Sequence, residues 1–436
     1  MINRLSLFLL LIMHALILSG CTKDPVNTDM TNPEPEEKMV PIVMVHGALA
    51  SGDTYSKHSM LWTSNGYRQE LLHAYDWNSL GGNNALAMEQ LDNLINSILQ
   101  TFKTDKVVLI GHSAGGGLSY NYCNDTERAK KILKYVHIGS SPMNSLPGSD
   151  KNIPTLNIYS KGDKIVTGAD IPGAENVVFD DLDHYEVATD EASFEKIYTF
   201  IIGKKPSVKQ IIRKNSPFIE GRIVTLGENA PDTIVTVKVY KINPLTGERI
   251  GNPLQIFKPK SGGYFDKLQV NSDDYHEFEI TSPNPQFRTL HYYREPFIHD
   301  NAFVYLRTFP PANSLAGILL SNLPKDDNQS VVAVFSANKS IIHQRDRLDV
   351  QGMNLANEVL CAPQNSVIAM FLYDNGDKNS TGNGHAAFGL FPFLRGADIY
   401  IPATSPESLT LKLNNRQLTV KNYKSATEGV VIAVFD

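Results

Sequence analysis

The sequence predicts a doubly wound α/β domain with a mostly parallel sheet, followed by two all-β domains. Between residues 40 and 203, continuous apolar runs alternate with segments of helical periodicity, and such runs are typical of parallel strands buried on both faces. After residue 203 the helical periodicity disappears and short alternating strands take over. A chain of 436 residues is long enough for roughly two to three domains.

The elements of the first domain follow from apolar spacing. Buried strands are predicted at VPIVMVHG, KVVLIG, KYVHIGS and TLNIYS, with a further strand at NVVF. One helix presents an apolar face made of Leu91, Leu94, Ile95, Ile98 and Phe102. Another helix follows a predicted N-cap at Thr189, with the same spacing in Phe194, Ile197, Tyr198 and Ile201. Strands and helices in alternation predict the doubly wound arrangement.

The second half of the chain is divided into a β-sandwich domain at 204–289 and a C-terminal β domain at 290–436. TIVTVKVYKI places Val235, Val237 and Val239 on one face of a strand. SLTLKLNNRQLTV predicts a hairpin with Asn414 and Asn415 in the turn. Further strands are predicted at AFVYLRTF, SVVAVFSA, SVIAMFLYD, ADIYIP and VVIAVF.

The first residues have the pattern of an export signal. Arg4 precedes an apolar run from Leu5 to Leu18, and small residues and Cys21 follow. The ending LSGC resembles the bacterial lipobox, which implies cleavage after residue 20 and lipid attachment to Cys21. The alternative is an uncleaved anchor, but the run is short for a span of about 20 residues. Residues 21–39, rich in Pro, Glu, Asp and Asn, are expected to form a disordered tether. An exported lipoprotein at the outer membrane or cell surface is therefore predicted.

Composition argues against nucleic acid as a partner and against a framework of disulfide bonds. The net charge is −6 and no long Lys/Arg cluster is present, which argues against nucleic acid as a partner. After Cys21 only Cys123 and Cys361 remain, and they fall in different predicted domains, so we expect no disulfide framework. Cys123 is expected to pack as a small apolar residue.

A candidate nucleophile lies in GHSAGG, where Ser113 stands between Gly111 and Gly115. Gly-x-Ser-x-Gly alone is a weak signal. Here a buried strand precedes the motif and a helical pattern follows, and small neighbours suit the strained strand-to-helix turn that exposes a nucleophilic serine. The context therefore favours a nucleophile over an inert serine in a Gly-rich turn.

Partners for Ser113 occur in the order acid, then histidine, which is the order of α/β-hydrolases. Asp163 follows the strand TLNIYS, and His184 follows the next strand. Both are expected at the carboxyl edge of the sheet, where open α/β sheets collect functional groups. Three other acids, Asp180, Asp181 and Asp183, abut the histidine and are interpreted as solvated loop residues. The other histidines have other interpretations: His112 fills the variable position of the motif, His137 lies inside a strand, and His276 belongs to the β region.

Residues 40–203 resemble a compact bacterial lipase or esterase of the α/β-hydrolase superfamily. The matching phrases are VHGALASGDTY, AYDWNSLGG, GHSAGGGLSY, YSKGDKIV and DHYEVATD. The β region resembles, more weakly, the C-terminal domains of Archaeoglobus-type lipases. The resemblance implies acyl transfer by Ser113, His184 and Asp163, with an oxyanion hole formed by the backbone N–H groups of Ala48 and Ala114. His46 would be structural, its ring bonding to loop backbone.

The substrate side leaves several possibilities open. Only about a dozen residues separate Ser141 from Ile153, too few for a large cap domain. A small lid could come from residues 51–67, whose large side chains either line an acyl pocket or pack on the sheet; these are Tyr55, Met60, Leu61 and Trp62.

Two features of the β region were weighed as binding sites. Its aromatic clusters either bind lipid, polymer or glycan, or belong to the core, which is the more common case; they are Phe388, Phe391 and Phe393, and Tyr292, Tyr293 and Phe297. The loop YDNGDKNSTGNGH offers possible calcium ligands but lacks the full acidic spacing, so a solvated hairpin turn is favoured; the ligands would be Asp374, Asn375, Asp377 and Asn379.

The leading functional prediction is a serine hydrolase acting on carboxylic esters, in particular lipid esters, as a lipase or esterase. The alternatives are a polyester depolymerase or carbohydrate deacylase, and a non-catalytic surface-binding lipoprotein that retains a hydrolase shell. The mechanism calls for no metal and no organic cofactor. The expected partners are the ester substrate and the membrane that holds the lipid on Cys21.

Overall fold

The computed structural model describes residues 39–389, 391–404 and 407–436. The predicted signal peptide, the lipidation site Cys21 and all but the last residue of the tether lie outside these ranges. Within them, no helix has both the length and the apolar composition that a bilayer span requires.

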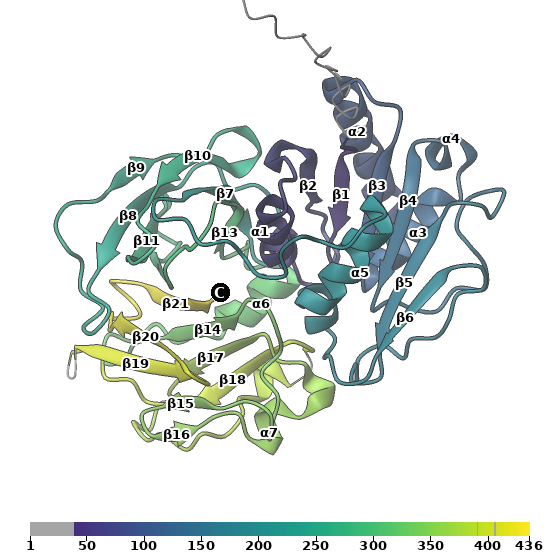
Figure 1. The fold of residues 1–436 in the computed structure, drawn as a ribbon. Coiled ribbons are helices and arrows are strands. Elements are labelled where there is room, and N and C mark those ends of the chain that lie inside the picture. Colours follow the sequence, from purple (N-terminus) through teal and green to yellow (C-terminus); the bar gives the residue numbers. More distant parts are fainter. Residues whose placement is uncertain (1–38, 390, 405–406) are drawn as a thin grey trace, which may run out of the picture. The chain divides into compact units, whose positions relative to one another are not determined.

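A six-stranded parallel sheet forms the centre of the first half of the chain (Figure 1). Its order is β2-β1-β3-β4-β5-β6, and every neighbouring pair is parallel. The strands are β1 (Ile42–Val45), β2 (Leu72–Tyr75), β3 (Val107–His112), β4 (Ile132–Ile138), β5 (Thr155–Ser160) and β6 (Glu175–Phe179). The order of strands confirms the doubly wound α/β core, and β2 adds a strand that the sequence analysis did not identify.

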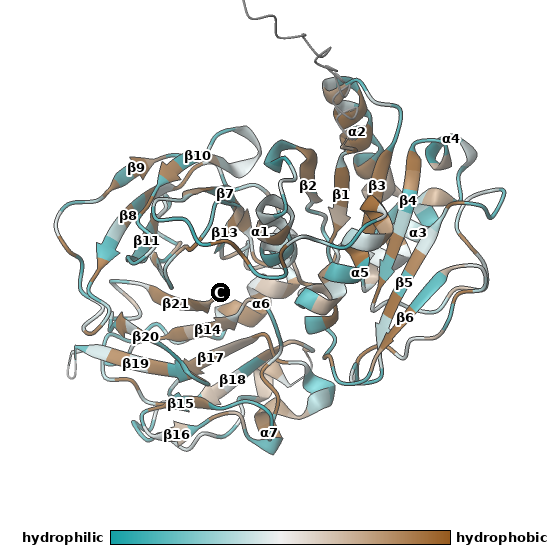
Figure 2. Ribbon diagram, viewed as in Figure 1, coloured by the Kyte–Doolittle hydropathy of each residue, from teal (hydrophilic) through white to brown (hydrophobic). Residues whose placement is uncertain are grey.

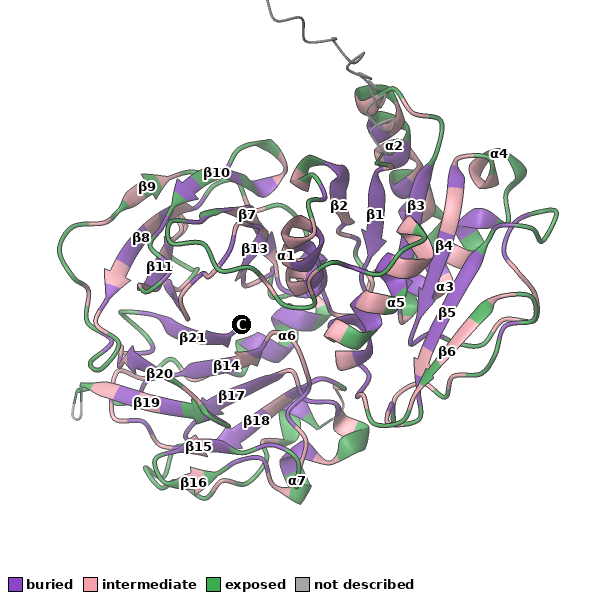
Figure 3. Ribbon diagram, in the orientation of Figure 1, coloured by how far each residue is buried: buried purple, intermediate pink, exposed green. Residues whose placement is uncertain are grey.

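Helices cover both faces of this sheet. α1 (Ser56–Ser64) and α5 (Glu191–Ile202) pack on the face that receives Ile42 and Met44. α2 (Asn84–Phe102) and α3 (Ala114–Cys123) pack on the opposite face, with Val43 and Val45. Successive side chains of β1 thus enter different cores, which explains why β1 is buried and apolar throughout and why β3 is buried throughout and apolar from Val107 to Ile110 (Figures 2 and 3). A short α4 (Thr126–Ala129) follows α3.

The N-cap of α5 is Asp190 and not Thr189, so that prediction was wrong by one residue. The Asp190 carboxylate accepts a hydrogen bond from the N–H of Ala192, which satisfies one of the free donors of the first turn. The Thr189 hydroxyl instead donates to the carbonyl of Asn338, in the β region.

Three sheets make up the second half of the chain. Their orders are β10-β7-β13, β18-β17-β14-β21-β12-β11-β8-β9 and β16-β15-β19-β20. The strands are β7 (Phe218–Thr225), β8 (Thr236–Ile242), β9 (Gln255–Phe257), β10 (Tyr264–Gln269), β11 (Tyr275–Thr281), β12 (Leu290–Arg294), β13 (Asn301–Thr308), β14 (Val332–Ser336), β15 (Leu348–Val350), β16 (Met353–Asn354), β17 (Ala369–Tyr373), β18 (Leu394–Asp398), β19 (Ser408–Leu413), β20 (Arg416–Lys421) and β21 (Val430–Phe435). Two short helices, α6 (Leu315–Ser321) and α7 (Glu358–Cys361), interrupt them.

The eight-stranded sheet is the middle layer of this half. One of its faces shares a core with the three-stranded sheet, and the other shares a core with the four-stranded sheet. The middle sheet contains strands from before and from after residue 289. The predicted division into domains at 204–289 and 290–436 stays a prediction. Val235, Val237 and Val239 face the first core, and Asn414 and Asn415 join β19 to β20 in the predicted hairpin.

The aromatic clusters and two loops of the β region differ in part from expectation. The core interpretation of the aromatic clusters is confirmed for Tyr293 and Phe388, which are buried, whereas Tyr292 and Phe297 are buried but also line a cavity. The strand expected at ADIYIP lies earlier, because β18 ends at Asp398. The hairpin expected at residues 373–385 was wrong, since the flanking strands β17 and β18 run parallel and need a crossover.

Buried polar groups complete this part of the fold. Asp374 is buried, and its carboxylate accepts hydrogen bonds from the N–H groups of Gly376 and Lys378. The part of the chain that the structure describes holds no group of three His, Cys, Asp or Glu residues placed to bind a metal. Cys123 and Cys361 are both buried and unpaired.

Candidate active site

Ser113 lies in the sharp turn between β3 and α3. Its φ of 54° and ψ of −125° are unfavourable for a residue with a side chain, and surrounding contacts hold them. The N–H of Ser113 donates to the carbonyl of Ile138, and the Ser140 hydroxyl donates to the Ser113 carbonyl at 2.7 Å. A Cβ on Gly111 would lie 2.6 Å from the carbonyl oxygen of Gly115, so only glycine fits there. The backbone of this turn therefore holds the Ser113 side chain at the edge of the sheet.

The structure brings Ser113, His184 and Asp163 together. His184 Nε2 is 2.9 Å from Ser113 Oγ, and His184 Nδ1 is 2.7 Å from Asp163 Oδ2. Asp163 follows β5 and His184 follows β6, so three loops at the carboxyl edge of the sheet contribute one side chain each. The imidazole is buried and Ser113 is partly exposed, which leaves the hydroxyl as the accessible end of the chain of hydrogen bonds.

The Asp163 carboxylate is held in its charged form. Burial acts to raise its pKa, but the hydrogen bond to His184, together with the N–H groups of Ile165 and Val166, outweighs burial, and the pKa is below its usual value. An ionised carboxylate at this position accepts a hydrogen bond from the Nδ1–H group of His184, which fixes the tautomer in which Nε2 can accept a proton from Ser113.

The two predicted oxyanion donors flank Ser113. Ala114 is the first residue of α3, and Ala48 lies in the loop after β1. A Cβ on the neighbouring Gly47 would lie 3.0 Å from the Cβ of Ser113, so this loop packs directly against the nucleophile. Among the described residues, neither the N–H of Ala48 nor that of Ala114 donates to another group. The assignment of these two N–H groups as oxyanion donors stays a prediction.

His46 has the structural role that was predicted. Its Nδ1 is 2.8 Å from the carbonyl oxygen of Gly47, and its Nε2 accepts a hydrogen bond from the N–H of Trp77. The Trp77 indole N–H donates in turn to the His46 carbonyl. Burial lowers the pKa of His46, which keeps the ring neutral. The ring therefore ties the loop after β1 to the loop after β2.

Two further side chains contact His184 that the sequence analysis did not assign to the site. His112 Nε2 is 2.8 Å from the His184 carbonyl oxygen, and burial lowers the pKa of His112 to about 3, so the neutral ring donates this hydrogen bond. The ring of Phe393, from the β region, stacks on the imidazole with an interplanar angle of 16°. Position 112 was identified only as the variable residue of the motif, and no local pattern marks Phe393.

Asp183 is buried, so its interpretation as a solvated loop residue was wrong, although Asp180 and Asp181 are exposed as expected. Its carboxylate accepts hydrogen bonds from the N–H and hydroxyl of Ser340, at 3.1 and 3.0 Å. Arg345 adds an ion pair at 2.9 Å. These partners come from the β region, more than 150 residues away, so no local pattern in the sequence indicates them.

The β region also contacts the loop after β1. Asn229 is buried, and its amide donates to the carbonyls of Ala50 and Trp77 at 2.8 and 3.0 Å. Its side-chain oxygen accepts from the Ser51 hydroxyl at 2.5 Å. Three aspartate–arginine pairs connect the two halves of the chain around the site: Asp53–Arg307, Asp76–Arg222 and Asp183–Arg345.

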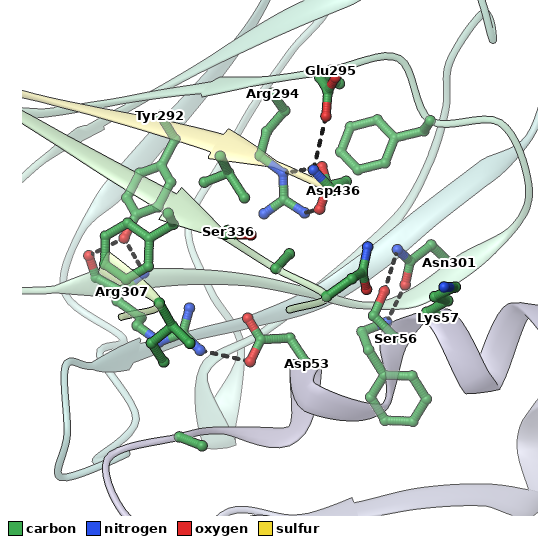
Figure 4. A pocket seen from close by; sticks show the side chains of 18 of the residues that line it. Asp53, Ser56, Lys57, Tyr292, Arg294, Glu295, Asn301, Arg307, Ser336 and Asp436 are labelled. Carbon is green, nitrogen blue, oxygen red and sulfur yellow. Dashed lines mark hydrogen bonds and ion pairs between the residues drawn. The ribbon is translucent and has the colours of Figure 1, made fainter. Parts of the chain in front are cut away.

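A cavity of about 710 Å³ lies between the catalytic loops and the β region (Figure 4). On the side of the parallel sheet it is lined by Leu49, Ala50 and Asp53 and by Tyr185, the neighbour of His184. Apolar side chains of the β region line much of the rest, including Ala316, Leu319, Leu320, Phe335, Phe391 and Leu394. Its size is that of a site for a small molecule or a chain.

Most of the large side chains of the segment 51–67 pack on the sheet, and one lines the cavity. Tyr55, Leu61 and Trp62 are fully buried in the core on one face of the parallel sheet. Met60 instead lines the cavity. The segment is therefore anchored to the sheet and exposes one side chain to the cavity.

Comparisons with known families divide the chain in three. A profile of the α/β-hydrolase fold matches residues 40–171, and a profile of the lipase C-terminal domain matches residues 217–311. A third profile, of another C-terminal domain, matches residues 322–436. The first two matches agree with the resemblance that the sequence motifs suggested, and they support a hydrolase.

Several solved structures are similar to the first part of the chain. A predicted CIB-like hydrolase from Thermoplasma acidophilum is 14% identical, with 39% of this chain and 89% of that chain covered and a TM-score of 0.31. A monoacylglycerol lipase from Paleococcus ferrophilus is 15% identical, with 38% of this chain and 96% of that chain covered and a TM-score of 0.30. Lipase B from Aspergillus fumigatus is 12% identical, with 39% of this chain and 54% of that chain covered and a TM-score of 0.31.

Proposed function

We propose that this chain is a serine hydrolase of carboxylic esters, since residues 40–171 match the α/β-hydrolase fold and residues 217–311 match the lipase C-terminal domain. The observation that carries the proposal is the continuous hydrogen-bond path from Ser113 through His184 to Asp163. A hydroxyl, an imidazole and an ionised carboxylate in this order are the machinery of acyl transfer.

In the first half-reaction, Ser113 Oγ attacks the ester carbonyl carbon while its proton passes to His184 Nε2. The oxyanion that forms accepts hydrogen bonds from the N–H groups of Ala48 and Ala114, in the loops that flank Ser113. Asp163 stabilises the imidazolium without taking up the proton. When the ester C–O bond breaks, the imidazolium gives its proton to the departing alcohol, and the acyl group stays on Ser113.

In the second half-reaction, water takes the place of the alcohol. His184 removes a proton from the water, whose oxygen attacks the acyl carbon, and the bond to Ser113 breaks. The proton then returns to Ser113 Oγ and the carboxylic acid leaves. The partial exposure of Ser113 supports access for both the ester and the water.

Lipid esters are the substrate class that the cavity supports. An apolar space beside the catalytic loops would take up a long chain, and burial of each CH₂ group contributes about 0.8 kcal/mol. We therefore expect kcat/KM for p-nitrophenyl esters to rise from butyrate to dodecanoate. Met60→Trp should reduce activity on the long ester about tenfold and leave butyrate hydrolysis intact, whereas Met60→Leu, which keeps the side-chain volume, should change neither. An optimum at butyrate in the wild type would contradict a lipid substrate.

The decisive experiment for the reaction class is covalent labelling. A fluorophosphonate probe should label the wild-type protein, and Ser113→Ala should abolish both labelling and ester hydrolysis while the thermal stability is retained. Absence of labelling in the folded wild type would favour a binding protein with a hydrolase shell.

Export and lipid attachment complete the proposal, and they are supported by the sequence of residues 1–21. In a bacterial host that processes lipoproteins, the wild type should incorporate labelled palmitate and sediment with membranes. Cys21→Ala should lose the label. Equal labelling of both proteins would contradict lipid attachment at this residue.

A further inference from the structure

The loop that carries Ala48, the predicted oxyanion donor after β1, contains a strained residue. Leu49 has a φ of 61°, in the left-handed region that suits glycine and is unfavourable for a residue with a bulky side chain. Such a conformation persists only where surrounding contacts hold it. On one side of the loop, the hydroxyl oxygen of Ser79 accepts a hydrogen bond from the N–H of Leu49 at 2.9 Å. The β region contacts the loop from another side.

That contact is made by Asn229, in the connection between β7 and β8. Its amide nitrogen donates to the carbonyl oxygens of Ala50 and Trp77, at 2.8 and 3.0 Å, and lies 3.2 Å from Nε2 of His46. Its side-chain oxygen accepts a hydrogen bond from the Ser51 hydroxyl at 2.5 Å. One side chain thus contacts the residues just before and just after the strained part of the loop. Asn229 is only 4% exposed, so water has little opportunity to replace these hydrogen bonds.

Asn229 is itself fixed in place. Its φ of 58° is left-handed, a conformation that asparagine tolerates better than most residues. Its N–H donates to the carbonyl of Thr225 at 3.0 Å, and the N–H of Thr225 donates to the carbonyl of Ala230 at 2.8 Å. A Cβ on Gly227, in the same turn, would lie 3.4 Å from a side-chain carbon of Leu49. The turn therefore packs against the strained residue as well as bonding to its neighbours.

We propose that Asn229 is a positioning residue of the active site, which holds residues 47–51 in the conformation that presents the N–H of Ala48 to the oxyanion. Without the amide, the carbonyl of Ala50 and the hydroxyl of Ser51 would lose buried partners, and the strain at Leu49 could relax. This inference rests on the proposed function, because an oxyanion forms only if Ser113 attacks an ester. The β region then contributes to the rate of the reaction through the loop.

A pair of asparagine variants tests the inference by kinetics. Asn229→Gly removes the amide without adding strain, because glycine tolerates the left-handed backbone. Asn65→Gly is the matched control: the amide of Asn65 also donates to two backbone carbonyls, of Leu61 and Val208, and accepts from a serine hydroxyl, but at the end of α1. With p-nitrophenyl butyrate, Asn229→Gly should lower kcat about 100-fold with little change in KM, since the donor is displaced and not the substrate site. Asn65→Gly should retain the wild-type kcat, and equal kcat in the two variants would contradict the role of Asn229.

A thiono ester separates an effect on the oxyanion from a loss of active protein. In p-nitrophenyl thionobutyrate, sulfur replaces the carbonyl oxygen, and this larger, weaker acceptor gains little from donors placed for oxygen. Asn229→Gly should therefore lower the ratio of kcat/KM for the butyrate to kcat/KM for the thiono ester about tenfold or more. A structural defect alone would lower both values equally, so an unchanged ratio would overturn the proposal. Ser51→Ala, which removes one hydroxyl, should lower the ratio to a smaller extent, and it decides the question if Asn229→Gly does not fold.

Hydrogen exchange tests the support of the loop without any reaction. The N–H groups of Leu49 and Gly52 donate to Ser79 Oγ and Asp76 Oδ1, at 2.9 and 2.7 Å, so their exchange reports how often this segment opens. Asn229→Gly should raise the exchange rate of peptides that cover residues 46–55 about tenfold, and the control variant should not. Equal exchange in Asn229→Gly and the wild type would refute the inference whatever the kinetics. If the wild type hydrolyses no ester, the proposed function is refuted, and faster exchange in Asn229→Gly would still show that Asn229 holds the loop.

Discussion

A comparison of two glycines in α3 tests the packing behind the candidate nucleophile. A Cβ on Gly115 would lie 2.3 Å from the carbonyl oxygen of His46 and 2.4 Å from that of Val45, so the end of β1 would have to move. A Cβ on Gly117, two residues later in the same helix, meets nothing within 4 Å. Gly117→Ala is therefore a matched control for Gly115→Ala.

The two variants share one energy term and differ in another. Alanine in place of glycine inside a helix stabilises by about 1 kcal/mol, and both variants gain this. Gly115→Ala also meets two backbone carbonyls that no rotamer change can relieve, and overpacking of this kind costs about 3 kcal/mol. The difference between the free energies of unfolding of the two variants should thus be about 3 kcal/mol, with Gly117→Ala slightly more stable than the wild type.

The same displacement should reach the active site. The loop that carries Ala48 begins where β1 ends, and a shift of about 1 Å in a reacting geometry can reduce the rate about 100-fold. Urea unfolding would give the stabilities, and hydrolysis of p-nitrophenyl butyrate would give kcat. If Gly115→Ala matched Gly117→Ala in both, the close approach of α3 to β1 would be refuted as the reason for glycine at this position.

Three further predictions follow. Asp163→Asn should lower kcat about 10⁴-fold with little effect on KM, since the amide no longer fixes the His184 tautomer; an unchanged kcat in steady-state assays would argue against this carboxylate. Arg345→Met should lower kcat and cost about 2 kcal/mol of unfolding free energy, because it leaves a buried carboxylate unpaired, whereas Arg347→Met, which breaks an exposed pair, should stay within about 0.5 kcal/mol. The free energy of unfolding of the His276→Phe variant should rise relative to that of the wild type as the pH falls. Burial lowers the pKa of His276 to about 4, so the neutral ring's contribution is complete above pH 6.5 and is lost toward pH 4. Between pH 7.5 and 5.5 the wild type should lose about 1.4 kcal/mol relative to the variant in urea unfolding, and no difference would show that the histidine is solvated.

Local sequence was sufficient where the chain itself supplies the physical constraint. The strands before Ser113 and Asp163 were predictable because parallel strands buried on both faces are rich in Val, Ile and Leu. The meeting of Ser113, Asp163 and His184 was predictable because carboxyl ends of parallel strands share one edge of the sheet. β2 was missed because its side chains, which include His73, do not form a continuous apolar run.

Sequence reasoning failed where the partner of a residue is distant in the chain. Asp183 resembles its exposed neighbours Asp180 and Asp181 in every local respect, and only Arg345 and Ser340 make its burial possible. Phe393 is buried, as the core interpretation of its cluster expected, yet its ring stacks on the imidazole. Such contacts depend on how the β region packs on the catalytic loops, which composition and periodicity do not encode.

The three aspartate–arginine pairs have a consequence for how this protein can change. Each pair places a carboxylate of the first half of the chain against a guanidinium of the second half. A β region taken from a related hydrolase would have to supply a cation at all three positions, or an acid would be left without a counter-charge. We therefore expect these segments to be inherited as a unit and to co-vary, and we expect chimaeras joined near residue 203 to need compensating mutations at the acids.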